Sequence, residues 1–274
     1  MKLPAAFCYV VIILVAFVNL VPALWTVLTS IKTELDAIAI PPKLIFQPTL
    51  AAYSDLLFGR AFGVELGRFT WNSVKAAGIT TIITVVASLC AAYSLARMRF
   101  RGRNAAGLLI LATRMLPPIA TILPLYLFVN MLGLLDTIMS LVLAYSAIGI
   151  PLAVWLLRGY ILDVPMEVEE SALIDGCNRL QTIVRIVIPL ILPGLLTVAF
   201  LTFLLAWNDF EIMSVLAFER AKTLPVAVTF FITQQGIIWP SMTAVATVML
   251  IPPIMFVLLA QKYFVTGLGS GAIR

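Results

Sequence analysis

The residues best suited to chemistry gather in one short polar stretch, residues 163–175. Five of the chain's thirteen acidic residues fall there, although charged residues make up only 11% of the sequence. Clustered carboxylates have to lie in water or against a basic partner, because burying an unpaired charge is costly. Whether solvent or a partner surrounds this stretch therefore decides how the chain works.

The usual groups for catalysis are missing from the rest of the sequence. There is no histidine, which removes the commonest general base and metal ligand. Cys8, Cys90 and Cys177 are scattered without a metal-binding spacing, which is typical of small apolar packing residues. No GxxxxGK[ST] loop occurs, so the chain lacks that route to ATP hydrolysis. We expect neither an enzymatic activity nor a bound cofactor or metal in this chain.

The acidic stretch is predicted to be a helix followed by a turn and a second helix. Pro165 suits a first helical turn, Gly176 a helix end, and Asn178 the start of the next helical run. Pro189 and Pro193 should break or kink the chain afterwards. Such a loop either rests on lipid headgroups or docks a protein partner. Its acidity favours the protein, because anionic lipid would repel it.

The elements that flank this loop are apolar enough to cross a membrane. The chain is 62% hydrophobic, and its mean hydropathy is +1.09. Stretches near the ~20 residues of a spanning helix recur. They predict six transmembrane helices, over 7–28, 76–96, 105–128, 137–157, 187–207 and 242–264. The first has an apolar run too long for a cleavable signal peptide, so we expect a retained helix.

The arginines predict the orientation of these spans. Arg97, Arg99, Arg101 and Arg103 lie between the second and third spans, whereas the loop 129–136 has neither lysine nor arginine. The positive-inside rule then places the arginine loop, the acidic loop 158–189 and both termini in the cytoplasm. The loop 31–75 is extracytoplasmic, where it either docks a protein or simply connects two spans. The pI near 9.3 follows from this topology, and we expect no nucleic-acid partner.

Several motifs resemble those of a known transporter family. Glu170-Ser171-Ala172, Asp175-Gly176, Ile186 and Pro189 resemble the EAA loop of binding-protein-dependent ABC importer permeases, with Ser171 and Ile188 as departures from its pattern. Further matches resemble the carbohydrate-uptake branch, in particular its maltose-permease-like second subunit. They are the segments 123–126, 132–137, 207–209 and 267–272.

This resemblance implies an all-α membrane protein with the type I ABC importer permease fold, forming one transmembrane domain over residues 1–274. It also implies a second homologous permease subunit, two cytoplasmic ATP-binding subunits that carry ATP and Mg, and an extracytoplasmic solute-binding protein. The ATPase-coupling residues would be Glu169, Glu170, Ser171, Ala172, Asp175, Gly176, Ile186 and Pro189. The C-terminal tail 267–274 would reach between the ATPases through Gly267, Gly269, Gly271 and Arg274.

Glu170 is the residue that we expect to contact a basic group on the ATPase. The alternative is that Glu170 only caps or solvates its helix.

A second group of polar residues is predicted to lie along the substrate path. Arg114 follows Ala105 by nine residues, about 14 Å into a helix and near mid-membrane. Pro117 and Pro118 come next and should kink the helix, because each frees the backbone carbonyl four residues earlier. Arg114 then either faces a polar cavity or another subunit, or snorkels toward the cytoplasm. Aromatic, amide and carboxylate groups suited to binding a sugar lie near the outer mouth of the predicted translocation path. They are Trp207, Asn208, Asp209 and Glu211. Trp207 is alternatively an interfacial anchor.

The function predicted from these features is half of the translocation path of an ATP-driven carbohydrate importer. The membrane would be the cytoplasmic (inner) membrane of a bacterium or archaeon. One alternative is a permease of the same class for a non-sugar solute. A secondary transporter is less favoured, because no carboxylate lies well inside a span.

Overall fold

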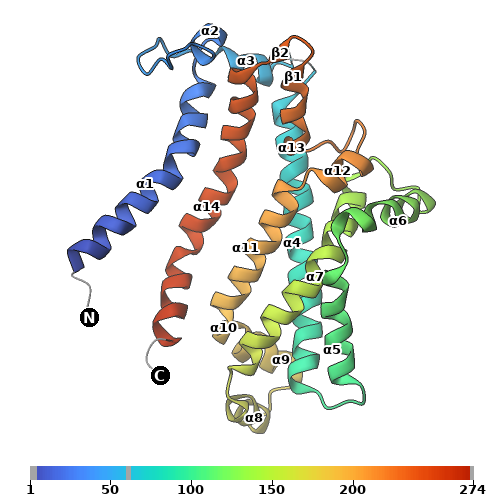
Figure 1. The fold of residues 1–274 in the computed structure, drawn as a ribbon. Coiled ribbons are helices and arrows are strands. Elements are labelled where there is room, and N and C mark those ends of the chain that lie inside the picture. Colours follow the sequence, from blue (N-terminus) through green and yellow to red (C-terminus); the bar gives the residue numbers. More distant parts are fainter. Residues whose placement is uncertain (1–4, 60–62, 272–274) are drawn as a thin grey trace. The chain divides into compact units, whose positions relative to one another are not determined.

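The computed structural model describes residues 5–59 and 63–271, and the regular elements in these ranges are helices apart from one short hairpin (Figure 1). The all-α prediction is therefore confirmed. The chain divides into two compact units, residues 1–70 with 224–252 and residues 71–223 with 253–274. Two long helices, α4 and α14, contribute residues to both units.

The first unit contains α1 (Ala5–Ser30), which is apolar and carries exposed side chains from Tyr9 to Leu20. A helix that is apolar all round is stable only when lipid or another protein covers it. The segment after α1 holds α2 (Glu34–Ala37) and α3 (Ala51–Leu57). Thr33 starts α2 by accepting a hydrogen bond from the Asp36 backbone N–H.

Lys32 organises the residues between α1 and α3, although it is only 2% exposed. Its ammonium group donates to the carbonyl oxygen of Lys43 at 2.8 Å and lies 4.6 Å from the centre of the Trp25 ring. The ring of Phe46 lies at 5.0 Å from the same ammonium group. A carbonyl and two aromatic faces thus compensate the buried charge.

The hairpin of the first unit joins β1 (Ile232–Thr233) to β2 (Gly236–Ile237), with Ile232 opposite Ile237. It follows α13 (Leu224–Ala227) and η3 (Val228–Phe231) and leads directly into α14 (Trp239–Gly271).

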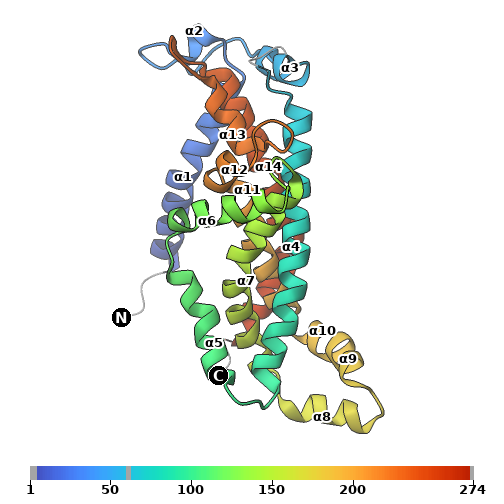
Figure 2. The same cartoon turned by 90° about the vertical axis from the view of Figure 1, so that its right-hand side faces the viewer.

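The second unit is built around α7 (Ile138–Leu162), which packs against α4 (Leu66–Arg97) and α11 (Leu192–Asn208). Gly149 allows the three helices to approach closely. A Cβ atom at this position would lie 3.4 Å from the Thr84 side chain and 3.6 Å from the Thr202 side chain. Figure 2 shows α7 beside α4 along most of its length.

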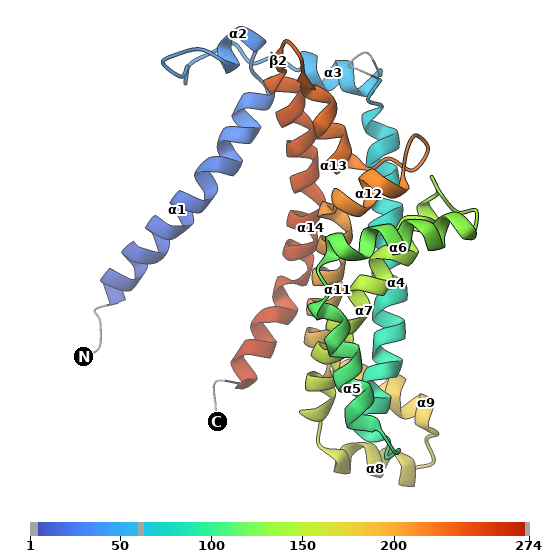
Figure 3. The ribbon, with the colours of Figure 1, turned by 45° about the vertical axis from the view of Figure 1, so that its right-hand side comes forward.

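Two of the six expected spans are sharply bent pairs of helices. The span expected over 105–128 consists of α5 (Arg103–Ala112), η1 (Thr113–Met115) and α6 (Pro118–Met131), with a bend of 102° (Figure 3). The extended backbone of Leu116 and Pro117 makes the break, because the residue before a proline avoids the helical region. Among the described residues, four helices are long and apolar enough to span a membrane, or six if each bent pair counts once.

The span expected over 187–207 is bent by 82° between α10 (Ile188–Leu190) and α11. A π-helical turn, η2 (Ile183–Val187), precedes the bend. Pro189 and Pro193 lie on either side of it and remove backbone donors there. The sequence therefore predicted the positions of both breaks and missed their size.

Two further boundaries differ from the expected ones. α4 begins at Leu66, inside the loop expected over 31–75, because a helix can continue past the apolar core into the polar interface. α14 extends to Gly271, so Gly267, Gly269 and Gly271 belong to a helix whose backbone bonds simply continue. Arg274 lies outside the described residues.

Candidate functional site

The acidic loop folds into α8 (Met166–Ile174) and α9 (Arg179–Thr182), which project from the end of the second unit (Figure 2). Gly176 ends α8 with a φ of +91°, which favours glycine. Its N–H donates to the Leu173 carbonyl at 3.2 Å, and the Cys177 N–H donates to the Ala172 carbonyl at 3.0 Å. This pair of bonds is a Schellman motif, which fixes the exit direction of the chain.

The second helix of the loop begins at a reciprocal cap. The Asn178 side chain accepts from the Gln181 backbone N–H at 2.9 Å, and the Gln181 side chain accepts from the Asn178 N–H at 2.8 Å. This capping box pairs two donors that the helix itself leaves free. Both ends of the turn are consequently held by local hydrogen bonds, as the glycine and asparagine positions predicted.

Glu169 anchors α8 to the rest of the second unit. It is 5% exposed, and its carboxylate accepts from the Arg97 Nε at 2.7 Å and from the Tyr93 hydroxyl at 2.9 Å. Arg97 also donates through Nη2 to the carbonyls of Ile161 at 2.8 Å and Val164 at 2.6 Å. One guanidinium thereby joins the end of α4, the end of α7 and the middle of α8.

The sequence indicated Arg97 only as a marker of topology and did not single out Tyr93. The sequence feature that could have indicated them is their spacing of four residues at the end of a span, because this spacing places both side chains on one face of α4. Glu169 was expected among the residues that contact a partner, but its carboxylate is occupied inside the chain.

The other coupling residues predicted in the acidic loop divide between a buried inner face and an exposed outer face. Ala172 is buried like Glu169, whereas Glu170, Ser171, Asp175 and Gly176 are exposed. Further along the loop Ile186 is half-buried and Pro189 is exposed. The outer face therefore combines carboxylates with uncovered apolar groups, including Leu173 and Ile174, of which Ile174 is 86% exposed.

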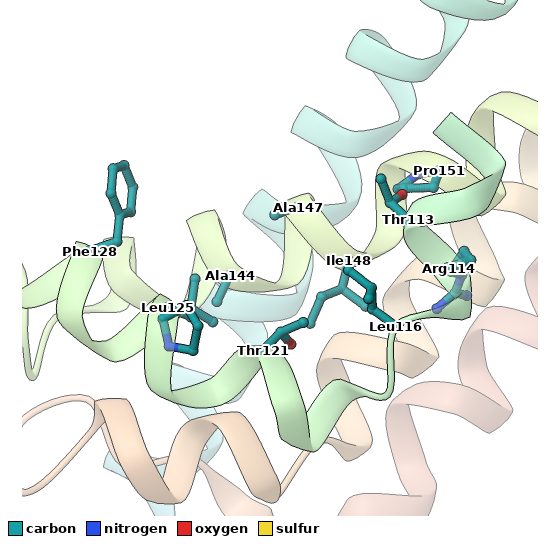
Figure 4. Close-up of a pocket in the computed structure, with 11 residues that line it drawn as sticks. Thr113, Arg114, Leu116, Thr121, Leu125, Phe128, Ala144, Ala147, Ile148 and Pro151 are labelled. Atoms are coloured by element: carbon teal, nitrogen blue, oxygen red, sulfur yellow. The ribbon is translucent and has the colours of Figure 1, made fainter. Parts of the chain in front are cut away.

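Arg114 lies at the bend between α5 and α6, in η1, and not inside a continuous helix as expected. It borders a cavity of about 380 Å³ between this bend and α7 (Figure 4). The cavity wall is otherwise mainly apolar and is formed by Thr113, Leu116, Thr121, Pro124, Leu125, Phe128, Ala144, Ala147, Ile148 and Pro151. Arg114 therefore borders a cavity, but its side chain is exposed and the cavity wall is mainly apolar instead of polar as expected.

The residues expected at the outer mouth do not line this cavity. Trp207 is 1% exposed and stacks on Phe203 with ring centres 5.4 Å apart, so it belongs to the core. The Asp209 carboxylate accepts from the N–H of Ile212 at 3.0 Å, within the first turn of α12 (Glu211–Leu216). Asn208 and Glu211 are exposed.

A further carboxylate that sequence reasoning missed is Asp136, which ties two loops together. Its Oδ1 accepts from the backbone N–H groups of four consecutive residues at 2.9 to 3.1 Å, those of Phe218, Glu219, Arg220 and Ala221. Its own N–H donates to the Leu216 carbonyl at 2.9 Å, with φ at +58°. Desolvation raises the pKa of Asp136, but these four donors outweigh it and hold the pKa below its ordinary value of 3.8.

Comparison with known proteins identifies the family. Residues 83–269 match the family described as "Binding-protein-dependent transport system inner membrane component". The chain belongs to this family. It is thus an inner membrane component of such a transport system, and the predicted ABC importer permease is confirmed.

Individual relatives and a solved structure agree with this assignment. The permease is 33% identical over 266 residues to the trehalose/maltose transport system permease protein MalG of Thermococcus litoralis (strain ATCC 51850 / DSM 5473 / JCM 8560 / NS-C), covering 96% of this chain and 94% of that protein. It is 35% identical over 261 residues to the trehalose transport system permease protein SugB of Mycobacterium tuberculosis (strain CDC 1551 / Oshkosh), covering 93% of this chain and 92% of that protein.

A chain of a bacterial ABC transporter that imports the acidic polysaccharide alginate superimposes with a TM-score of 0.75 at 23% identity, covering 95% of this chain and 96% of that chain. The expected type I ABC importer permease fold is therefore confirmed.

The buried pair of Arg97 and Glu169 predicts a large loss of stability when one partner is removed. We expect Arg97→Met to lower the free energy of unfolding by about 3–5 kcal/mol, because it leaves the Glu169 carboxylate buried without its cation. Arg97→Met combined with Glu169→Gln should recover part of this loss. Thermal unfolding of the permease in detergent measures both, with the exposed Arg99→Met as the control. Equal melting temperatures for Arg97→Met and Arg99→Met would contradict the anchoring role.

The hydrogen bonds to Asp136 predict a dependence on pH. Because the folded pKa lies below the unfolded value of 3.8, the carboxylate contributes stability above that value, which is lost as the pH falls through the folded pKa. Asp136→Asn should cost about 1 kcal/mol at neutral pH, a small value because the group is partly exposed. The difference in melting temperature between the permease and this variant should narrow below pH 4. A difference in melting temperature that stays constant down to pH 3 would show that ionisation of Asp136 contributes nothing to the stability of the fold.

Proposed function

We propose that this permease forms half of the translocation path of an ATP-driven carbohydrate importer and receives the conformational change of its ATPase through α8. The observation that carries the proposal is the combination of an anchored inner face and an exposed acidic and apolar outer face on one short helix. A coupling element must move as a rigid body, and local caps with a buried ion pair make α8 such an element.

The acidic loop residues then have two different roles. Glu169 and Ala172 position α8 from inside the chain, whereas Glu170, Ser171, Asp175 and Gly176 are available to a cleft of the ATPase. Glu170 remains the residue proposed to contact a basic group there. Ile186 and Pro189 follow on the path along which the motion would reach α11.

The partners proposed are a second homologous permease, two ATP-binding subunits that hold ATP and Mg, and an extracytoplasmic solute-binding protein. The names of the relatives support a sugar as the substrate class, since two of them are permeases for trehalose or for trehalose and maltose. The arginine loop supports an orientation with both termini in the cytoplasm. The last residues of the chain, up to Arg274, are proposed to contact the ATPases.

The hairpin of the first unit is proposed as the surface that meets the solute-binding protein. A hollow of about 760 Å³ lies beside it and is lined by Glu34, Gln234, Gln235 and Trp239, among others. Amide, carboxylate and aromatic groups can contact either a sugar or a polar protein surface. In the second unit, the cavity beside Arg114 supports the proposal that Arg114 lies along the solute path.

Reconstitution of the permease with its partner permease, its ATPases and the sugar-loaded binding protein tests the coupling role. Glu170→Lys should lower sugar-stimulated ATP hydrolysis at least about tenfold, because it places a like charge against the basic partner group. Because Glu170 is exposed, the variant should still fold. Glu65→Lys makes the same charge change at an exposed residue of the first unit and should leave the rate unchanged. If Glu170→Lys also leaves assembly and stimulated hydrolysis intact, the coupling role of this face is excluded.

A further inference from the structure

A second charged site lies at the arginine-rich end of the second unit, and its lining contains no residue of α8 and none that lines the cavity beside Arg114. It is a pocket of about 280 Å³ between the end of α4, the start of α5 and the last turns of α7. One water molecule occupies roughly 30 Å³ in the liquid. The pocket is several times larger than that, so it has room for a phosphate group. Its lining is Leu95, Arg103, Asn104, Gly107, Leu108, Trp155 and Arg158.

The pocket carries two positive charges without a counter-charge. Arg103 and Arg158 are both half-buried, and no carboxylate of the described residues lies within ion-pair distance of either guanidinium. Arg103 donates to the Met98 carbonyl and Arg158 to the Leu95 carbonyl, each at 3.5 Å, the weak limit of a hydrogen bond. Each guanidinium has five N–H donors, so most of them remain available to an anion.

Neighbouring groups orient these arginines and add to the positive potential. The Trp155 indole donates to the Gly107 carbonyl at 3.3 Å, and its ring lies 5.5 Å from the Arg158 guanidinium carbon. The pocket also contains the first residues of α5, whose cap, Gly102, provides no side-chain acceptor. The Arg103 N–H donates to the Phe100 carbonyl at 3.4 Å, and the positive end of the helix dipole at this first turn attracts negative charge as well.

An apolar surface continues outward from the pocket along α5. Leu108, which lines the pocket, is 63% exposed, and Leu109 beside it is 69% exposed. Positive charges, an amphipathic tryptophan and an adjoining apolar strip are together typical of a membrane interface. A free phosphate would use only the charged part of this surface, whereas a phospholipid would use both.

We propose that this pocket binds the phosphate of an anionic phospholipid, with an acyl chain lying against Leu108 and Leu109. Arg103 and Arg158 would each donate to the phosphate oxygens, so that the lipid bridges α5 to α7. The positive-inside rule places the pocket in the leaflet that carries anionic lipids, where each arginine strengthens binding.

Quenching of tryptophan fluorescence by brominated lipid tests the proposal on the full chain in phosphatidylcholine vesicles. Brominated phosphatidylglycerol is compared with brominated phosphatidylcholine, and the contribution of Trp155 is the difference between the wild-type chain and Trp155→Phe. Each signal is normalised to its unquenched intensity. We expect Trp155 to be quenched preferentially by phosphatidylglycerol. Arg103→Gln and Arg158→Gln should each lower that preference about fivefold, the factor typical of one arginine near an anionic surface.

Arg99→Gln is the matched control, because Arg99 lies in the same loop but does not line the pocket. It should keep the preference for phosphatidylglycerol. An unchanged preference in both pocket variants would overturn the proposal. An equal loss in Arg99→Gln would show diffuse attraction instead of a site, and abolition of the preference by inorganic phosphate would show a site for a free anion.

Discussion

The second unit depends on one buried guanidinium, that of Arg97. It compensates the Glu169 carboxylate and two carbonyl oxygens at the point where α4, α7 and α8 meet. Both side chains of the ion pair are less than a tenth exposed. Removing either charge would leave the other in a poorly solvated place, so the three helices are held in one arrangement. The outward presentation of the acidic face of α8 follows from this arrangement.

A comparable device holds the other end of α7. There Asp136 gathers four consecutive backbone N–H groups from the loop 218–221, just before α7 begins at Ile138. Each end of α7 is thus fixed by a single charged side chain that compensates backbone groups of another segment. Charge is scarce in this sequence and is used where segments distant in the chain have to meet. Under the proposed coupling role, a helix fixed at both ends would carry a displacement of α8 toward the bend near Arg114.

Local features of the fold could be predicted from the sequence, and the long-range pairing could not. Gly176 and Asn178 predicted the end of α8 and the start of α9, because these choices depend on backbone dihedrals and adjacent hydrogen bonds. Pro117 and Pro189 predicted breaks, but the angles of 102° and 82° result from the packing of the flanking helices. Glu169 appeared to be one surface acid among several. No pattern could show that a residue 72 positions earlier neutralises it. Trp207 was misplaced at a solute-binding surface for the same reason, since its burial depends on neighbours in space.

The measurement that tests the central claim most directly is the distance between α8 and the end of α4 during the ATPase cycle. Spin labels at Met166→Cys, at the start of α8, and Met98→Cys, both exposed positions, report this distance in the assembled transporter after the native cysteines are replaced by serine. The account predicts one narrow distance distribution that stays the same with and without ATP and broadens in Arg97→Met. A distance that changes between nucleotide states in the labelled permease that retains Arg97 and Glu169 would show that α8 moves independently of α4, and would contradict the account.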